Sequence, residues 1–420
     1  MRPKDSADLL SIFSAGLKAV HAETTTNHFL SYFSDLSQVK GKIYVVGAGK
    51  ASAFMAKAIE EKCLQNLPEK FAGGVVIVKD GHGTDLKKIK CLEAGHPMPD
   101  ARGLSAAQEM IDLLGTLSPD DLLFFCLSGG ASALLPAPVA GLSLQDKIEI
   151  TRTLMAGGAD IRELNTVRKH LSQIKGGQLF QKTKARVVTL AISDVPGNKP
   201  ELIGSGPTVI DPTTVGEAAG VLNRFSSLEK WKTFLQETPK AASERISKSE
   251  FHLIATPQMA LAAASAQAAA LGYGVSQPID FLEGDIEAVE NQWHGFRQQA
   301  GEGSAGKRRC LILSAEPTVK VKGRGRGGRN SELALRLAIR WGLSAPFAFL
   351  AAGTDGTDGP TDAAGAVCDE TTLAQATARG LSPRQALETN DAYTFFSALD
   401  QLVVTGPTAT NVMDLEILLF

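Results

Sequence analysis

The sequence predicts an α/β protein made of two α/β domains. Apolar runs of strand length repeatedly end in turns rich in glycine and serine, and each turn leads into a segment of helical periodicity. A polar stretch at about 222–250, with frequent Lys and Glu, separates an earlier set of such units from a later one. We expect a Rossmann-like first domain, a mostly parallel sheet with helices on both faces, at residues 1–235 together with about 395–420. The second α/β domain is expected at 236–394, and the active site in the cleft between the domains.

The first strand, glycine turn and helix are expected within residues 41–63. Gly47 and Gly49 match the start of the dinucleotide fingerprint G-x-G-x-x-G, but Ser52 stands at the position of the third glycine. Lys50 lies inside the turn, where a cation beside a helix N-terminus suits an anionic group. The alternative is a structural turn that leaves Lys50 in solvent.

Two later strands also end in polar turns. The apolar run 122–127 leads into Ser128-Gly129-Gly130-Ala131-Ser132, and the run 187–192 leads into Ser193-Asp194 and then Gly204-Ser205-Gly206. Ligands of parallel sheets bind at the carboxyl ends of strands, so these turns are candidate ligand contacts. Asp194 is the carboxylate in this region that we expect to take part in chemistry.

Residues 161–180 have the periodicity of a helix. Its apolar stripe and its basic residues occupy different faces, which favours a solvated basic face. The stripe consists of Leu164, Val167, Leu171 and Ile174, and the basic residues are Arg168, Lys169, His170 and Lys175.

A loop rich in glycine and arginine, at 322–330, comes directly before another predicted helix. Glycine forfeits backbone entropy in regular structure and clustered cations repel one another, so the segment favours a loop that holds an anion. Asn330 or Ser331 is expected to cap the helix, whose free N–H groups would add to the anion site. A solvated basic turn is the alternative.

The strand expected at 347–352 is followed by an acidic loop that contains Asp355, Asp358 and Asp362. Carboxylates are hard oxygen ligands that suit Mg²⁺. The pattern is not that of an EF-hand, because the twelfth position counted from Asp355 is Ala366 rather than Glu. The alternative is a loop whose carboxylates cap its own turns.

Composition argues against several classes of protein. The 43 basic and 45 acidic residues leave a formal charge of -2, so net charge suggests no nucleic-acid partner. The five cysteines are widely spaced and include no C-x-x-C pair, which favours a reducing compartment. No apolar run reaches about 18 residues, so we expect a cytoplasmic protein without a membrane anchor.

In their order along the chain, these motifs resemble those of the class II glycerate kinases, also called the MOFRL family. The resemblance implies a kinase that uses ATP and a divalent cation such as Mg²⁺ to phosphorylate D-glycerate, giving 2-phosphoglycerate. It spans nearly the whole chain, and its motifs are Gly47-Ala48-Gly49-Lys50-Ala51, Gly95-His96-Pro97, 127–132, 167–172, Lys175-Gly176-Gly177, Ser193-Asp194-Val195, 205–208, Gly327-Gly328-Arg329-Asn330, 353–356 and 405–408.

The resemblance also implies roles for individual residues. Lys50 and Arg329 are then active-site cations. Because phosphoryl transfer needs positioning and metal, we also expect Asp194 to orient or deprotonate the 2-hydroxyl, and Asp355 and Asp358 to hold Mg²⁺ directly or through water. The bidentate fork of arginine suits the carboxylate of glycerate, so Arg168 or Arg326 is expected to bind it. Contacts to substrate or nucleotide are expected from Gly47, Gly49, Ser128, Gly129, Gly130, Ser132, Arg168, Lys175, Ser205, Glu316, Arg326 and Asn330.

Two other functions stay open at this point. The first glycine turn also suggests an NAD(P)H-dependent hydroxypyruvate reductase, although the missing third glycine and Lys50 argue against that cofactor. The same scaffold would also serve a sensor that binds a sugar acid or phosphate without turnover. The sequence leaves the oligomeric state open, with a homodimer as one outcome.

Overall fold

The computed structural model describes residues 2–240, 249–301, 308–342 and 346–420. The chain forms two α/β units: unit 1 comprises Met1–His21 and Thr256–Phe420, and unit 2 comprises Ala22–Ala255. Unit 2 is therefore inserted into unit 1 after the first helix of the chain. Part of the polar stretch predicted to separate the domains, 241–248, lies outside the described residues.

Unit 2 is built on a six-stranded parallel sheet with the strand order β3-β2-β1-β4-β5-β6. This order is typical of dinucleotide-binding folds, and it confirms the predicted Rossmann-like sheet. The order reverses between β1 and β4, so the turns after these two strands meet at the topological switch point. The strands are β1 (Ile43–Ala48), β2 (Phe71–Lys79), β3 (Ile89–Ala94), β4 (Leu122–Leu127), β5 (Arg186–Ile192) and β6 (Glu250–Ala255).

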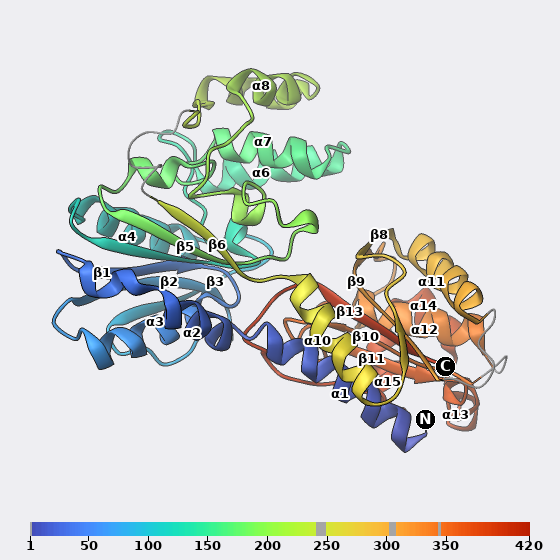
Figure 1. Cartoon of the computed structure of the whole chain (residues 1–420). Helices are drawn as coiled ribbons and strands as arrows, with labels where there is room; N and C mark the ends of the chain where they lie inside the picture. The colour runs from blue at the N-terminus through green and yellow to red at the C-terminus, as the bar shows by residue number, and fades with distance from the viewer. Residues whose placement is uncertain (1, 241–248, 302–307, 343–345) are drawn as a thin grey trace. The chain divides into compact units, whose positions relative to one another are not determined.

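Helices cover both faces of this sheet (Figure 1). On one face α3 (Ser52–Asn66) packs against β1 and β2, and α2 (Ala22–Tyr32) packs against α3; on the other face α4 (Ala101–Thr116) packs against β2 and β3. Because β4 is covered on both faces, all its residues are buried, which explains its uninterrupted apolar sequence. Shorter turns of helix are η1 (Ser34–Gln38), α5 (Ala131–Leu134), η2 (Gln178–Gln181), η3 (Pro196–Asn198) and η4 (Ile203–Ser205).

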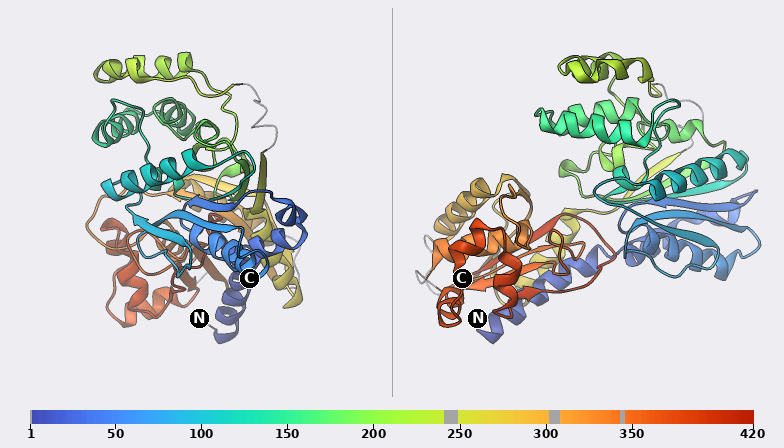
Figure 2. Two further views of the ribbon diagram at one scale, coloured as in Figure 1. Left: turned by 90° about the vertical axis from the view of Figure 1, so that its left-hand side faces the viewer. Right: turned by 180° about the vertical axis from the view of Figure 1, so that it is seen from behind.

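A second helical layer of unit 2 has its own apolar cluster. It consists of α6 (Leu144–Ala156), α7 (Ile161–His170), α8 (Val215–Asn223) and η5 (Ser226–Phe234), and Figure 2 shows α6, α7 and α8 stacked beyond α4. Ile150, Val167, Leu222 and Trp231 are buried in this cluster. The helix predicted at 161–180 ends at His170, and the chain then turns through Gly176 and Gly177.

Unit 1 contains a mixed sheet with the order β12-β11-β10-β13-β9-β7, and β8 pairs with β9. β13 runs antiparallel to both of its neighbours, so the start of β13 lies beside the ends of β10 and β9: Gly353 pairs with Asp414, and Asp414 pairs with Ala315. Residues from β9, β10 and β13 therefore lie together at one end of these strands, which we call the polar edge of the sheet. The strands are β7 (Gly274–Ser276), β8 (Phe281–Asp285), β9 (Arg309–Thr318), β10 (Ala348–Gly353), β11 (Gly365–Asp369), β12 (Leu402–Val403) and β13 (Asp414–Leu419).

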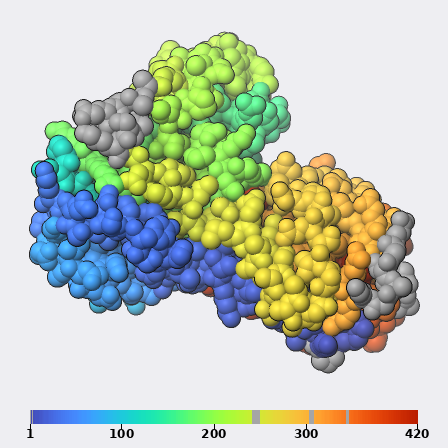
Figure 3. All heavy atoms as spheres, viewed as in Figure 1, coloured from blue at the N-terminus to red at the C-terminus, as the bar shows by residue number. Residues whose placement is uncertain are grey.

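The two faces of this sheet carry different helices. α1 (Pro3–Ala19) and α10 (Pro257–Ala270) lie side by side against one face, and the side chains of α10, in yellow, cover much of the surface of unit 1 that Figure 3 shows. α12 (Arg329–Trp341) and α11 (Ile286–Gly301) pack on the other face, where Trp293 and Leu418 belong to one core cluster. The remaining helices are α13 (Thr372–Ala378), α14 (Pro383–Glu388) and α15 (Ala392–Ser397).

The predicted domain boundaries are wrong in three respects. Residues 395–420 do not join the Rossmann-like sheet, because β13 is a central strand of the sheet in unit 1. Residues 1–21 also belong to unit 1, since α1 packs on α10, and the boundary falls after Ala255 because β6 completes the parallel sheet. The apolar tail correctly predicted a final strand, but an apolar pattern shows that a strand is buried and not which sheet it enters.

All five cysteines are free thiols. Four of them are buried, and burial raises the pKa of Cys63 and Cys310 to about 12, which makes these thiols poor nucleophiles. Within the described ranges, no helix has both the length and the apolar character needed to cross a bilayer.

Candidate active site

The glycine turn after β1 is held against the turn after β4. The Ala51 N–H donates to Ser128 Oγ at 3.0 Å, and the Lys50 N–H donates to the Gly129 carbonyl at 2.9 Å. Gly49 has a φ of +132°, and a Cβ at this position would overlap with Ser128 Oγ, so glycine is required for the close approach. The two turns therefore form one connected loop pair at the switch point, with Gly47 near the end of β1 and Gly130 in the second turn.

Lys50, Ser128 and Asp194 follow three neighbouring strands, β1, β4 and β5. Because these strands are adjacent and parallel, the three residues leave the sheet at the same edge, as the sequence predicted. Ser128 is buried, whereas Lys50 and Asp194 are half-buried. A cation and a carboxylate are thus placed at the edge where ligands of this fold bind.

Ser132, Ser205 and Lys175 form a hydrogen-bonded group beside this edge. The two hydroxyl oxygens are 2.6 Å apart, and the Lys175 ammonium donates to the carbonyl and the hydroxyl of Ser132 at 3.1 and 3.2 Å. Ser205 Oγ also donates to Asn165 Oδ1 at 3.4 Å. Burial, and then the nearby charges of Lys147 and Arg168, lower the pKa of Lys175 well below its usual range. Three residues from separate motifs are therefore brought together.

The basic residues of α7 are not on a solvated face, contrary to the prediction. Lys169 is 2 % exposed, and its ammonium forms an ion pair with Asp211 at 3.1 Å. His170 is also buried, and its Nδ1 lies 2.8 Å from the Thr166 carbonyl oxygen. Arg168 is half-buried. The prediction failed because Asp211 pairs with Lys169 and Glu237 lies against His170, and the periodicity of one helix cannot reveal such distant partners.

In unit 1, Arg329 joins two carboxylates at the polar edge of the mixed sheet. Its Nη2 donates to Asp414 Oδ1 at 3.0 Å and its Nη1 donates to Glu316 Oε1 at 2.9 Å, while its Nε forms an ion-pair contact with Asp414 Oδ2 at 2.6 Å. Burial would lower the pKa of Arg329, but Asp414 and Glu316 raise it on balance. The two hydrogen bonds and the ion-pair contact occupy Nε and one N–H of each Nη, so two of the five N–H donors remain to bind a ligand.

Two buried acids, Asp414 and Glu416, stand on the same face of β13. Burial raises the pKa of Asp414 to about 6 although Arg329 opposes the shift. Glu416 Oε2 accepts a hydrogen bond from the Trp293 indole, whereas its Oε1 has no partner in the part of the chain that the structure describes. Burial raises the pKa of Glu416 to about 8. Both acids therefore bind protons at higher pH than ordinary carboxyl groups do.

The N-terminus of α12 already holds an anion, and that anion is Asp358. One Asp358 oxygen accepts the Asn330 N–H at 2.9 Å, and the other accepts the Ser331 N–H and hydroxyl at 2.9 and 2.6 Å. The helix begins at Arg329 after Gly328, so the prediction of Asn330 or Ser331 as its cap is wrong. Asp358 supplies the capping oxygens instead, and this terminus does not offer those N–H groups to a phosphate.

The Gly- and Arg-rich loop before α12 binds another part of unit 1. The N–H groups of Lys322 and Gly323 donate to Asn390 Oδ1 at 2.7 and 2.9 Å, and the Arg326 N–H donates to Asp391 Oδ1 at 2.8 Å. A Cβ at Gly323 would overlap with the Thr389 carbonyl, so glycine permits this approach. The loop is thus tied to residues 389–391 and does not form the predicted backbone cradle for an anion.

Arg326 lies apart from the Arg329 group. Its guanidinium stacks on the Tyr393 ring, 4.4 Å from the ring centroid, and the Tyr393 hydroxyl donates to Asp362 Oδ1 at 2.7 Å. Cation–π contacts of this kind are weak at exposed sites, so they leave the arginine able to move. Of the two arginines expected to bind the glycerate carboxylate, Arg168 is the more buried candidate, since Arg326 is exposed.

The acidic loop after β10 does not form a metal centre by itself. Asp355 Oδ1 accepts the N–H and hydroxyl of Thr357 at 2.9 and 3.0 Å, which is an Asx turn. Asp358 uses both oxygens on α12 and does not fit the predicted role of metal ligand. Over the described ranges, no group of three or more His, Cys, Asp or Glu residues is arranged to hold a metal ion. Of the predicted pair, Asp355 alone fits a metal that takes its other ligands from phosphates and water.

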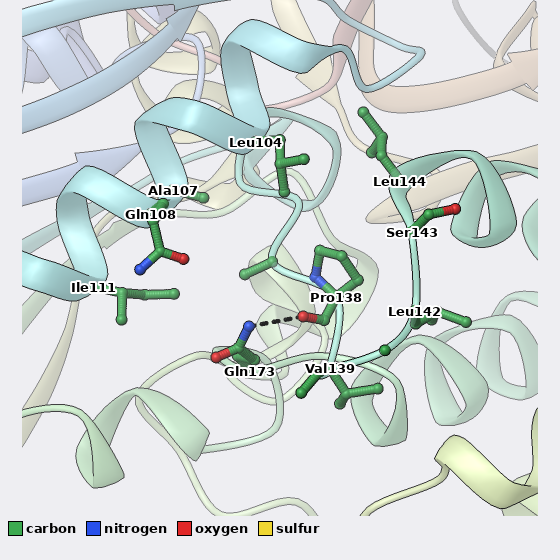
Figure 4. A pocket seen from close by; sticks show the side chains of 13 residues that line it. Leu104, Ala107, Gln108, Ile111, Pro138, Val139, Leu142, Ser143, Leu144 and Gln173 are labelled. Atoms are coloured by element: carbon green, nitrogen blue, oxygen red, sulfur yellow. Dashed lines mark hydrogen bonds between the residues drawn. The ribbon is translucent and has the colours of Figure 1, made fainter.

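A pocket of about 330 Å³ lies elsewhere in unit 2, between α4 and residues 137–144 (Figure 4). Gln173 Nε2 donates to the Pro138 carbonyl at 2.8 Å beside it. None of the residues that line this pocket is charged, and most are apolar. We therefore assign it no part in binding an anionic substrate or nucleotide.

Three polar residues near these groups were not predicted. Asp414 and Glu416 flank Leu415 at the start of an apolar strand, and Lys147 lies in the first part of α6. Carboxylates inside an otherwise apolar strand are unusual, and this signal could have identified the two acids. Lys147 gave no signal, since lysine near a helix start is ordinarily a solvated residue.

Comparison with known proteins places these groups in a family. The family profile "Domain of unknown function (DUF4147)" matches residues 8–238, and the profile "MOFRL family" matches residues 309–414. The chain is 42% identical to a protein of Agrobacterium vitis named "Putative hydroxypyruvate reductase", over 90% of this chain and 87% of that protein. It is 38% identical to a protein of Thermotoga maritima named "D-glycerate 2-kinase", over 90% of each.

A solved structure extends the comparison to the fold. The crystal structure of glycerate kinase from Thermotoga maritima aligns with a TM-score of 0.85 and 35% identity, over 99% of this chain and 100% of that chain. Together, the sequence matches, the two family profiles and the structural match cover nearly the whole length of this chain. The chain therefore belongs to the class II glycerate kinase family, which is also called the MOFRL family.

Proposed function

We propose that this chain is a glycerate 2-kinase, which transfers the γ-phosphoryl group of ATP to the 2-hydroxyl of D-glycerate and releases 2-phosphoglycerate and ADP. The observation that carries the proposal is the sequence similarity, over 90% of the chain, to relatives named for this reaction in two organisms. The arrangement of charged groups in each unit supports it, because phosphoryl transfer depends on positioning and electrostatic stabilisation.

Unit 2 supplies the groups at the carboxyl edge of its parallel sheet. The turns that contain Gly47, Gly49 and Ser128 to Gly130 bring backbone close to a ligand, and Lys50 stabilises the charge that develops on the transferred phosphoryl group. Asp194, at the end of β5, accepts the proton of the 2-hydroxyl or orients that hydroxyl for attack. Its half-buried position at the same sheet edge as Lys50 supports this role.

Unit 1 supplies a second cation and the carboxylates that hold it. Asp414 and Glu316 fix the Arg329 guanidinium, so its two remaining N–H donors keep a set direction toward a phosphate oxygen. Mg²⁺ bound with ATP would neutralise charge on the phosphates. Asp355 is the residue that we assign to the ion, with phosphate oxygens and water as the other ligands.

The alternative reaction, reduction of hydroxypyruvate by NAD(P)H, finds less support at the glycine turn. In dinucleotide-binding folds a carboxylate after the second strand binds the ribose hydroxyls. Here that carboxylate is Asp80, and both its oxygens accept hydrogen bonds from Arg102, at 2.6 and 2.9 Å. Ser52 stands at the third glycine position and is buried against the turn. The strand order suits a nucleotide, but these residues do not favour a nicotinamide cofactor.

The test is a coupled assay on purified protein. The protein is incubated with D-glycerate, ATP and Mg²⁺, and the product is detected through enolase with no phosphoglycerate mutase present. Signal through enolase alone is the expected result, since enolase accepts 2-phosphoglycerate and not its 3-phospho isomer. Oxidation of NAD(P)H by hydroxypyruvate without phosphorylation would replace the proposal by the reductase. Glycerate binding without either turnover would indicate a sensor.

A homodimer in the cytoplasm stays a prediction. Light scattering on the eluate of a size-exclusion column gives the molar mass directly, and a mass near twice 44.3 kDa is the expected result for a dimer. A mass near that of one chain would rule the dimer out under those conditions.

A further inference from the structure

Three basic residues of unit 2, Lys147, Arg168 and Lys175, are buried or half-buried, and none of them pairs with a carboxylate of the described residues. Lys147 is 6 % exposed, and its ammonium has no hydrogen-bond partner among the described residues. Lys175 is 1 % exposed and donates only to Ser132, whose oxygens are neutral. Neither these lysines nor the half-buried Arg168 forms an ion pair with any carboxylate that the structure describes. The side chain next to Arg168, Lys169, is by contrast paired with Asp211.

The three groups are close enough to affect one another. Burial, and then the charge of Arg168, lower the pKa of Lys147 to about 7, and the charges of Lys147 and Arg168 add to the effect of burial on Lys175. A buried charge is ordinarily paired, because leaving water without compensation costs several kcal/mol. On the same helix, by contrast, the charge of Lys169 is compensated by Asp211, so Lys169 needs no ligand.

Helix α6 adds to the positive potential. Lys147 is the fourth residue of α6, so its side chain starts in the first turn of a 13-residue helix. The N-terminus of a helix carries a partial positive charge that favours anions and opposes cations. It costs free energy to bury a charged lysine at this position, near two further cations from other segments. An anion bound among the three would remove that cost.

We propose that Lys147, Arg168 and Lys175 form an oxyanion-binding site, in which Ser132 and Ser205 supply neutral hydrogen bonds. This inference rests on the proposed function for its choice of ligand: the oxyanion is the carboxylate of glycerate or a phosphate of the nucleotide. The three cations come from α6, from α7 and from the turn after α7, so the site is assembled by the packing of separate segments. Lys147 is the member that no motif indicated.

The experiment compares wild-type protein with Lys147→Met, which keeps the length of the side chain and removes the charge. Arg152→Met is the matched control, because Arg152 is exposed and lies on the same helix. Thermal unfolding is followed at pH 7 with D-glycerate alone, with ATP alone and with inorganic phosphate. KM values for D-glycerate and ATP are then measured separately for each protein.

We expect ligand to raise the unfolding temperature of wild type and of Arg152→Met, and to do so in Lys147→Met only at concentrations at least about tenfold higher. A raised KM for D-glycerate would identify the carboxylate, and a raised KM for ATP would identify a phosphate. Unchanged anion response and unchanged KM values in Lys147→Met would overturn the inference. The binding measurements need no turnover, so they decide the question even if wild type proves not to phosphorylate glycerate.

Discussion

Replacing Lys147 by methionine should make the ligand-free protein more stable, because the substitution removes a buried and uncompensated charge. The pKa of Lys147 is about 7 in the folded protein, against an ordinary value of 10.5. The unfolded state thus binds more protons between these two values, so the penalty is full below about pH 7 and disappears as the pH rises to about 10.5. Integration gives about 4 kcal/mol at pH 7 and about 1 kcal/mol at pH 9.5 as upper estimates of the gain.

The assay is equilibrium unfolding in urea at these two pH values, in a buffer free of phosphate and sulfate, since such anions would compensate the charge. Hydrogen exchange of α6 amides gives a local measure that does not depend on the unfolding of unit 1. Arg152→Met should change the free energy of unfolding by less than about 0.5 kcal/mol, as exposed substitutions usually do. A Lys147→Met protein that is less stable than wild type, or whose gain does not fall between pH 7 and 9.5, would refute the reasoning.

Four further predictions concern single residues. Lys50→Ala should lower turnover by roughly two to four orders of magnitude, and near-normal turnover in the folded variant would remove Lys50 from the mechanism. Asp358→Ala should lower the free energy of unfolding by about 1–2 kcal/mol through loss of the α12 cap, whereas Asp355→Asn should raise the Mg²⁺ concentration needed for half-maximal activity. If Asp358→Ala alone changed the Mg²⁺ requirement, Asp358 would be the metal ligand and Asp355 would not. Glu416 binds its proton more tightly when folded, so this group favours folding below about pH 4.5 and loses that contribution as the pH rises to about 8. Glu416→Gln should therefore flatten the decline of stability over that range, and an unchanged profile would show that Glu416 ionises normally.

The parallel sheet and its polar edge could be predicted because both depend on local pattern. A fully apolar run such as 122–127 needs cover on two faces, and the residue after each parallel strand must lie at the same edge. Lys50, Ser128 and Asp194 were grouped correctly for that reason. The sequence pattern does not predict the order of the strands, but the alternation of strands and helices leaves few possible topologies.

Contacts between distant segments could not be predicted from pattern. Asp358 was assigned to metal because a carboxylate on a loop has the same sequence signature whether it binds an ion or a helix 28 residues away. The cations of α7 were assigned to solvent because nothing in their spacing indicates that distant residues such as Asp211 and Glu237 lie against them. Likewise, the apolar tail predicted a strand but not its place between β10 and β9.

The insertion of unit 2 into unit 1 sets an order for folding during synthesis. All six strands of the parallel sheet have emerged from the ribosome once residue 255 is free, so unit 2 can fold while the rest is being made. Helix α1 must wait far longer, since Thr410 bonds to the Val20 carbonyl across 390 residues and β13 is a central strand of its sheet. During that interval α10 is the first partner of α1 to be made, and the sheet that both helices cover is still incomplete. We expect nascent chains to need a chaperone that shields this first helix, and chains cut before β13 to aggregate although their parallel sheet is complete.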